Sequence, residues 1–371
     1  MPNLTGIKHS FSTAWRTAMS RVTSQRIRLA AKTPVPAGRL KCGLLGAGDF
    51  FHYAHAPALN RPECPLGITG VWARQPATFA AAQRHLRYAA RHFTERAPLL
   101  GSGIEAALIL LPNRMHFDAT REALDHGLHV YCEKPLALTV ADARLLAGAQ
   151  STGRTVLMNG FNQRFFHRHQ QITSILAENQ LGPVTRVQAF HNQDLRGLRD
   201  YAPLHREATG GGVLLNAGIH LLNLLLDWFG PVARVRARFQ NLALPVECGE
   251  DTATCELWFH SGVHATLTAS LANAADTTYE RIQIQGHAAT LETDFKRNTL
   301  TRIEAGKPRL KIPCRPEIMS DSVAGALQHF HACIRDGQPP ETGLDDFIRT
   351  LTVVEALTLA AQQGDEVNLP A

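Results

Sequence analysis

The stretch Leu40-Lys41-Cys42-Gly43-Leu44-Leu45-Gly46-Ala47-Gly48-Asp49-Phe50-Phe51 predicts how the chain begins to fold. A short apolar run is typical of a buried strand, and the glycines that follow indicate a tight turn into a helix. The first glycine permits the turn, and the second lets the backbone approach a pyrophosphate at the helix N-terminus. Because Phe51 stands where a third Gly or Ala is usual, the motif alone fits an ordinary strand–helix turn equally well.

Outward from this motif, short apolar runs alternate with helical stretches as far as about residue 160. Such alternation predicts a doubly wound parallel sheet with crossover helices over residues 40–160. Pro76 and the Thr139/Asp142 pair mark helix starts, and Gly127 marks a helix end. The expected strands are Leu40–Leu45, Leu66–Ala73, Ala106–Leu111, His129–Cys132 and Thr155–Met158.

From about Phe161 the pattern changes to helices followed by segments that alternate apolar and polar residues. It predicts an α+β domain on an open, mostly antiparallel sheet over residues 161–371, with a last helix near Asp345–Gln363 packing back on the first domain. The polar face of this sheet fits either solvent or a subunit interface. Helices are expected at Arg168–Asn179 and Gly212–Phe229, and strands at Val184–His191, Val232–Phe239, Asp251–Phe259, Val263–Ser270 and Tyr279–Gln285. In Val232–Phe239, Ala233, Val235, Ala237 and Phe239 would face the core, and Arg234, Arg236 and Arg238 would face outward.

Composition supports two domains and excludes several classes of protein. The chain has 371 residues, 44% hydrophobic and 19% charged, which excludes a disordered, collagen-like or coiled-coil chain. No apolar run approaches the length of a membrane span. Seven scattered cysteines suggest reduced thiols in a cytoplasmic setting.

The net charge of +6 is concentrated in the first 39 residues. This segment has no Asp or Glu, and without it the chain is close to neutral, so we expect no nucleic-acid partner. The segment fits an organelle-targeting peptide, an arm that packs on a neighbouring subunit, or a start codon placed too far upstream.

The end of the second expected strand indicates which nucleotide the first domain would prefer. The stretch Val71-Trp72-Ala73-Arg74 lacks the acid that binds a ribose 2′-hydroxyl in NAD sites. Arg74 could instead stack on the adenine and pair with a 2′-phosphate, the alternative being a solvated surface arginine. The sequence thus favours NADP(H), with NAD(H) possible.

Three further stretches carry a specific resemblance. Leu111-Pro112-Asn113-Arg114-Met115-His116, Cys132-Glu133-Lys134-Pro135-Leu136-Ala137 and Gly210-Gly211-Gly212-Val213-Leu214-Leu215-Asn216-Ala217-Gly218-Ile219-His220 resemble the Gfo/Idh/MocA oxidoreductase family, over residues 40 to about 368. The resemblance implies a Rossmann domain, a substrate domain with an open sheet, NAD(P) as cofactor, and sugars, polyols or nucleotide sugars as substrates.

The resemblance implies that Lys134 is the catalytic lysine, followed by a cis peptide bond to Pro135. Asn216 and His220 lie four apart on one expected helix, hence on one face. Many family members have Asp in place of Asn216, and often in place of Asn223 too. Because an amide cannot take a proton, Lys134 and His220 remain as the candidate proton carriers.

The motifs and the resemblance together give the expected site. The catalytic residues would be Lys134, His220 and Asn216, and substrate contacts would come from Lys134, Asn162, Arg206, Asn216 and His220. Cofactor contacts would come from Gly46, Ala47, Gly48, Asp49, Phe50, Phe51, Ala73, Arg74, Leu111, Pro112, Asn113, His116, Glu133, Lys134 and Arg164. Asn162, Arg164 and Arg206 fit a structural role equally well. No metal is expected, because the close pairs His52/His55 and His167/His169 lack a completing cluster.

These observations favour an NADP(H)-dependent oxidoreductase that acts on a secondary alcohol or ketone of a sugar, polyol or nucleotide sugar. One alternative is a redox-assisted glycosidase that retains its cofactor. Another is a non-catalytic nucleotide-sensing protein, which Phe51, Asn216 and Asn223 favour and Lys134 and His220 oppose. We expect a homo-oligomer, a dimer or tetramer formed through the polar sheet face, with no membrane partner.

Overall fold

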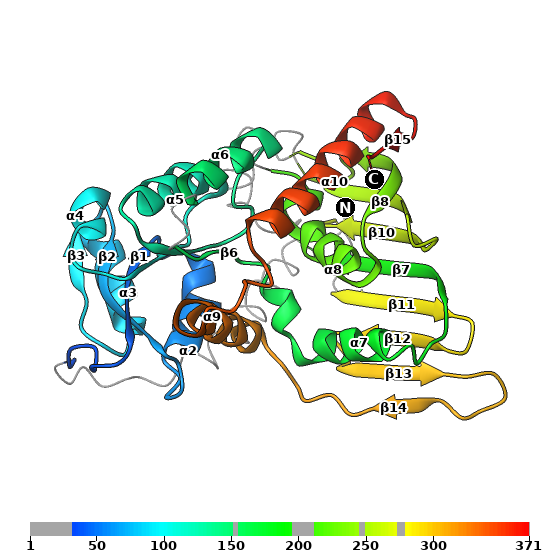
Figure 1. Cartoon of the computed structure of the whole chain (residues 1–371), viewed down its shortest axis with the longest axis horizontal. Helices are drawn as coiled ribbons and strands as arrows, with labels where there is room; N and C mark the ends of the chain where they lie inside the picture. The colour runs from blue at the N-terminus through cyan, green and yellow to red at the C-terminus, as the bar shows by residue number, and fades with distance from the viewer. Residues whose placement is uncertain (1–31, 151–154, 195–210, 245–248, 273–278, 371) are drawn as a thin grey trace, which may run out of the picture.

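The computed structural model describes residues 32–150, 155–194, 211–244, 249–272 and 279–370 (Figure 1). Within them, the first sheet has six parallel strands in the order β3-β2-β1-β4-β5-β6. This is the strand order of a dinucleotide-binding fold, so the predicted doubly wound domain is confirmed. The strands are β1 (Leu40–Leu45), β2 (Leu66–Trp72), β3 (Arg91–Phe93), β4 (Ala106–Ile109), β5 (His129–Cys132) and β6 (Leu157–Asn159).

Helices connect these strands at the places that local signals predicted. Pro76 opens α3, Gly127 adopts a left-handed φ of 70° after α5, and the Thr139 hydroxyl accepts the Asp142 N–H at 3.1 Å where α6 begins. The short strand β3 was not predicted, because three residues are too few for a periodic signal. The helices are η1 (Phe51–His55), α2 (Ala56–Leu59), α3 (Pro76–His85), α4 (Arg96–Leu100), η2 (Asn113–Met115), α5 (His116–Asp125) and α6 (Val140–Gln150).

The second sheet has nine described strands in the order β14-β13-β12-β11-β7-β10-β9-β8-β15. Only the β7–β10 pair among them is parallel, so the prediction of an open, mostly antiparallel sheet is confirmed. The strands are β7 (Val184–Asn192), β8 (Val232–Gln240), β9 (Thr252–Phe259), β10 (His264–Ser270), β11 (Glu280–Gly286), β12 (Thr290–Asp294), β13 (Thr299–Ile303), β14 (Leu310–Ile312) and β15 (Val367–Asn368). Strands β12 to β15 were not predicted.

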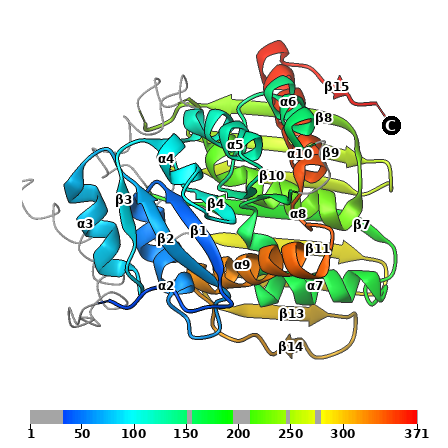
Figure 2. The same cartoon turned by 60° about the vertical axis from the view of Figure 1, so that its left-hand side comes forward.

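Helices lie over one face of this sheet (Figure 2). Residues on that face are buried, whereas Arg236 and Arg238 lie on the other, with Arg236 exposed. One expectation is wrong: Val232, rather than Ala233, is buried at the start of β8, because the register shifts between Val232 and Arg234. The helices here are η3 (Asn162–Phe165), α7 (His167–Ala177), η5 (Leu214–Gly218), α8 (Ile219–Phe229), α9 (Met319–Asp336) and α10 (Leu344–Gln363).

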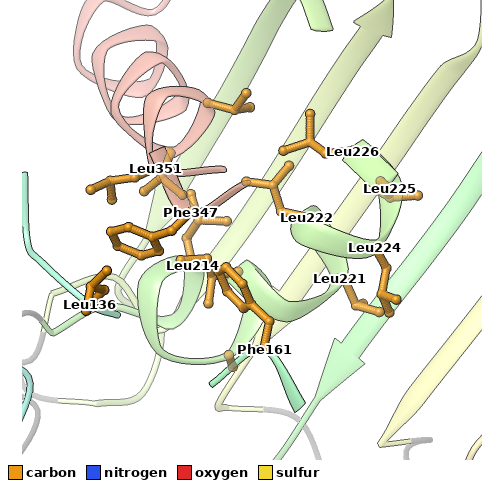
Figure 3. Packing of buried hydrophobic residues seen from close by; sticks show 14 of the residues in the cluster. Leu136, Phe161, Leu214, Leu221, Leu222, Leu224, Leu225, Leu226, Phe347 and Leu351 are labelled. Atoms are coloured by element: carbon orange, nitrogen blue, oxygen red, sulfur yellow. The ribbon is translucent and has the colours of Figure 1, made fainter. Parts of the chain in front are cut away.

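The two C-terminal helices connect the sheets. Phe330 of α9 packs with Phe51 and Tyr131 on one face of the parallel sheet. α10 contacts α6 and β6 as well as α8 and β8. Near its start, the Phe347 ring lies 6.1 Å from that of Phe161, beside the leucines of α8 (Figure 3). One continuous hydrophobic core therefore runs from the parallel sheet into the second sheet.

Candidate functional site

The turn after β1 contains two glycines, and glycine is needed at each for a different reason. Gly46 has φ 98°, and a Cβ atom there would overlap the carbonyl oxygen of Leu110. Gly48 faces open space, with nothing within 4 Å of the place where a Cβ atom would stand, directly before the helical residues that follow Asp49. The backbone is thus bare where a pyrophosphate would approach a helix N-terminus, so these residues fit a dinucleotide.

Phe51 does not obstruct this turn. Its side chain is fully buried in the core between the sheet and α9, and it begins the π-helical turn η1. The bulky third residue of the glycine pattern is therefore accommodated in the core. The expected contact of Phe51 with the cofactor is not supported, because the described side chain faces the protein interior.

Arg74 lies at the carboxyl edge of the parallel sheet, just after β2. Its side chain is exposed, while Ala73 is buried and donates its N–H to the Phe93 carbonyl at 3.0 Å. No hydrogen bond or ion pair joins the Arg74 guanidinium to the rest of the described chain. The guanidinium is therefore available to an anionic group at this edge.

His116 bridges the loops that follow β4 and β5. Its two ring nitrogens lie 2.7 Å from the carbonyl oxygens of Leu111 and Pro135 respectively. Burial lowers the pKa of His116, although the two carbonyl groups oppose that effect. His116 thus fixes the Leu111-Pro112-Asn113 segment against the loop that holds Lys134.

Glu133 is bound by protein groups on the inner side of the same loop. His55 of η1 lies 2.7 Å from its carboxylate, and both side chains are buried. A Cβ atom at Gly160 would lie 2.9 Å from that carboxylate, so the glycine leaves room for it. The His55–Glu133 contact therefore ties the helix after the glycine turn to the loop that holds Lys134.

The structure brings together Lys134, Asn216 and Asn113 across the two domains. Lys134 Nζ donates to the Asn216 backbone carbonyl at 2.6 Å, and the Asn113 amide donates to the Asn216 side-chain oxygen at 3.0 Å. The Lys134–Pro135 peptide bond is cis, as the resemblance implied. Burial lowers the pKa of Lys134, while the Glu133 carboxylate opposes the shift.

His220 completes this group from the first turn of α8. Burial, together with the Lys134 ammonium, lowers its pKa well below the usual range, and its Nδ1 atom has no hydrogen-bond partner among the described residues. Asn216 lies in the π-helical turn η5 rather than in regular α-helix, so the spacing of four residues crosses a wider turn than expected. Lys134, Asn216 and His220 are each half-buried.

Asn162 and Arg164 have structural partners in place of the expected ligand contacts. The Asn162 amide is buried and donates to the Ser322 hydroxyl at 2.8 Å. Arg164 donates from its three guanidinium nitrogens to Asn223 at 2.8 Å, Asp227 at 2.5 Å and Asp346 at 2.6 Å. Arg164 therefore joins η3, α8 and α10, and Asn223 belongs to this buried network. Arg206 lies outside the described residues.

Three buried residues of the second domain were not predicted as part of the site. His191 of β7, Glu280 of β11 and His169 of α7 are each 1% exposed. The only signal for them in the sequence is the close spacing of His167 and His169. That spacing alone does not distinguish metal ligands from buried structural histidines. Among the described residues, no three His, Cys, Asp or Glu side chains are grouped as a metal site. The described chain also has no helix long and apolar enough to span a membrane.

Comparison with known proteins gives the family. Residues 40–161 match the model of an oxidoreductase family with an NAD-binding Rossmann fold, and residues 169–292 match the Gfo/Idh/MocA C-terminal domain. The chain is 28% identical to D-apiose dehydrogenase of Paraburkholderia graminis, over 68% of this chain and 70% of that protein. It is 23% identical to D-xylose 1-dehydrogenase (NADP(+)) 2 of Haloferax volcanii, over 88% of this chain and 99% of that protein.

A solved structure of levoglucosan dehydrogenase in complex with NADH and levoglucosan has the same fold, with a TM-score of 0.80 and 18% identity. The match covers 90% of this chain and all of that chain. The two matched segments, the first of which contains the glycine turn and the lysine loop, thus agree on one assignment: this chain belongs to the Gfo/Idh/MocA family of NAD(P)-dependent oxidoreductases and acts as a dehydrogenase or reductase on CH–OH groups.

Proposed function

We propose that this enzyme is an NADP(H)-dependent oxidoreductase that interconverts a secondary alcohol and a ketone, or a cyclic hemiacetal and a lactone, on a sugar or related polyol. The observation that carries the proposal is the 2.6 Å hydrogen bond from Lys134 Nζ to Asn216, which holds the lysine of one domain against η5 of the other. Relatives named for D-apiose, D-xylose and 1,5-anhydro-D-fructose support the substrate class.

The cofactor would bind along the carboxyl edge of the parallel sheet. Gly46, Ala47, Gly48 and Asp49 would face the pyrophosphate, and Arg74 would pair with the 2′-phosphate, which favours NADP(H) over NAD(H). Leu111, Pro112 and Asn113, held by His116, would line the nicotinamide side, with Phe50 and Glu133 nearby. When bound, the nicotinamide supplies the hydride acceptor or donor.

The protein groups would then handle the hydroxyl proton. Lys134, whose pKa burial lowers, and His220 would take the proton of the alcohol during oxidation and return it during reduction. Asn216 would orient the hydroxyl without taking its proton, since an amide is neither acid nor base at neutral pH. Asn113 supports that role, because it donates to the Asn216 side chain.

We also infer that the enzyme forms a homo-oligomer through the outer face of the second sheet. On this face the Trp258 ring stacks on His264 at 4.9 Å, and the Arg234 guanidinium lies 4.3 Å from the Trp258 ring centre. A flat face with a partly exposed aromatic residue among arginines has the composition of a protein interface.

The decisive experiment is a fluorescence titration of nucleotide-free protein with NADPH and with NADH, followed by turnover assays on D-xylose, D-glucose and D-apiose. Tighter binding of NADPH, with turnover of at least one sugar, is the expected result. Tighter binding of NADH would refute the role of Arg74 and leave the enzyme class intact. Nucleotide binding without turnover of any sugar would refute the substrate class.

A further inference from the structure

His191 and Glu280 lie side by side on the face of the second sheet that the helices cover. The two residues are paired across the antiparallel strands β7 and β11, so their side chains point to the same side. On its other edge His191 pairs with Ala269 of β10. A Cβ atom at Gly218 would lie 3.2 Å from the Ala269 Cβ, so the turn η5, which carries Asn216, rests directly beside this position.

The His191 imidazole is buried without hydrogen-bond partners among the described residues. It is 1% exposed, and no described donor or acceptor reaches either ring nitrogen. The Tyr279 ring packs against it with a centroid distance of 4.7 Å. Leaving buried polar atoms unpaired is unfavourable, so both ring nitrogens can hydrogen-bond with a group that the described residues do not supply.

Glu280 is held by a hydrogen bond to one carboxylate oxygen, while its other oxygen has no partner among the described residues. Its Oε1 atom lies 2.8 Å from His169 Nε2, while Oε2 is buried without a partner in the part of the chain that the structure describes. His169 Nδ1 lies 2.8 Å from the Gln163 carbonyl oxygen, which can only accept, so Nδ1 carries a proton and donates it. The hydrogen bond between His169 Nε2 and Glu280 Oε1 then needs a second proton between those two atoms. The carboxylate is therefore fixed, with Oε2 left to accept further hydrogen bonds.

The charges around these atoms favour a neutral, hydroxyl-bearing ligand. Burial lowers the pKa of His191 to about 4, with Glu280 opposing and Lys134 adding to the shift. A neutral imidazole offers one donor and one acceptor, as a hydroxyl group does. The free carboxylate oxygen accepts from hydroxyl groups and repels a carboxylate placed directly against it.

We propose that His191 and Glu280 Oε2 form a hydroxyl-binding subsite beside Lys134 and His220, which takes neighbouring hydroxyl groups of a neutral sugar and disfavours sugar acids. The proposal rests on the proposed function and narrows its substrate class. His169 acts as a positioning residue, because it contacts Glu280 and fixes which oxygen is free. The proximity to the reacting group follows from the turn η5, which rests on Ala269 beside His191. Lys134 Nζ donates to Asn216 of that same turn.

The test compares His191→Phe, His191→Gln and Glu280→Gln with the wild type on D-xylose, D-glucose and D-glucuronate. His191→Phe is expected to lower kcat/KM for the neutral sugars about 10- to 100-fold, with partial recovery in His191→Gln. Glu280→Gln should raise the activity on D-glucuronate relative to D-glucose. NADPH affinity should remain within about twofold in all three variants. His287→Gln, an exposed histidine after β11, is the matched control.

A second readout is independent of turnover. In protein with carbon-13-labelled histidine, D-xylose or D-glucose added with NADP⁺ should shift the His191 ring signal, which is assigned by its loss in His191→Gln. A shift without turnover would refute the proposed function and retain the subsite. Turnover without a shift, or wild-type kcat/KM in His191→Phe, would overturn the subsite. Neither turnover nor a shift would refute both. If His191→Phe does not fold, His191→Gln and the wild-type spectrum decide.

Discussion

The Nζ atom of Lys134 lies 2.6 Å from the backbone carbonyl oxygen of Asn216, and this hydrogen bond joins the loop after β5 to the turn η5. The two residues are 82 positions apart and belong to different domains. The contact uses the backbone of Asn216, so its side chain keeps separate partners in Asn113 and the Gly212 carbonyl. Asn216 in place of an aspartate therefore leaves the hydrogen bond of Lys134 intact, because that bond uses the backbone carbonyl.

Removing the lysine should abolish chemistry without removing the cofactor. Lys134→Met keeps an unbranched side chain that is one atom shorter and deletes the proton-handling group, so kcat should fall about 100- to 10,000-fold. NADPH affinity, measured by fluorescence, should change little. Lys311→Met, on the exposed edge strand β14, is the control and should retain wild-type turnover. Unchanged turnover in Lys134→Met would contradict the assignment.

The two glycines of the first turn should differ in what they support. Gly46→Ala places a Cβ atom against the Leu110 carbonyl at a left-handed φ, so it should destabilise the fold by about 2–4 kcal/mol. Gly48→Ala enters open space and should leave thermal unfolding unchanged while weakening NADPH binding. Calorimetry and fluorescence titration on both variants check this contrast. Equal loss of stability in both would argue against a cofactor cradle at Gly48.

Arg74 should determine the preference between the two nucleotides. Arg74→Ala should weaken NADPH binding about tenfold or more and change NADH binding little, because only NADPH carries the 2′-phosphate. The ratio of the two dissociation constants is the measurement. Arg87→Ala, on the loop after α3, serves as a control for loss of surface charge. A ratio unaffected by Arg74→Ala would place the 2′-phosphate elsewhere.

Asp251 should make the stability depend on pH in the acid range. Burial raises the pKa of its carboxyl, but the N–H groups of Leu242, Leu244 and Ala243 and the Thr252 hydroxyl outweigh that effect and hold the pKa below its usual range. A lowered folded-state pKa stabilises the fold above the unfolded pKa of about 3.9, and this stabilisation is lost as the pH falls through the folded value.

Asp251→Asn should accordingly lower the free energy of unfolding by about 2–3 kcal/mol at neutral pH, since its amide nitrogen would face backbone donors. Denaturant titrations at several pH values should show this difference shrinking below about pH 4. A difference that stays constant into the acid range would mean that the charge of Asp251 is not what stabilises the loop.

The outer face of the second sheet should hold the subunits together. Trp258→Glu places a carboxylate where Trp258 stacks on His264, so sedimentation velocity should show a smaller species than the wild type. Leu359→Glu alters an exposed apolar residue of α10 instead, and it should leave the size unchanged. Identical sedimentation of Trp258→Glu and wild type would locate the interface elsewhere.

Local pattern in the sequence was enough to predict most of the strands and the glycine turn. Apolar runs and alternation report which residues are buried in a strand, and glycine at positions such as Gly46 reports a backbone shape that other residues resist. Strands β3 and β12 to β15 were not predicted, because they are short or because apolar and polar residues alternate only weakly in them. Gly46 and Gly48 could be singled out by their motif, whereas Lys134 and Asn216 were singled out because their stretches resemble those of the Gfo/Idh/MocA family.

Only the tertiary structure decided which polar residues face one another. Arg164 was expected at the cofactor, yet its partners Asn223, Asp227 and Asp346 are 59 to 182 positions away and hold it in the core. His191 and Glu280 gave no signal in sequence, because their pairing depends on the register of two strands separated by a long segment. Burial and hydrogen bonding of such groups follow from long-range packing, which no local pattern along the chain specifies.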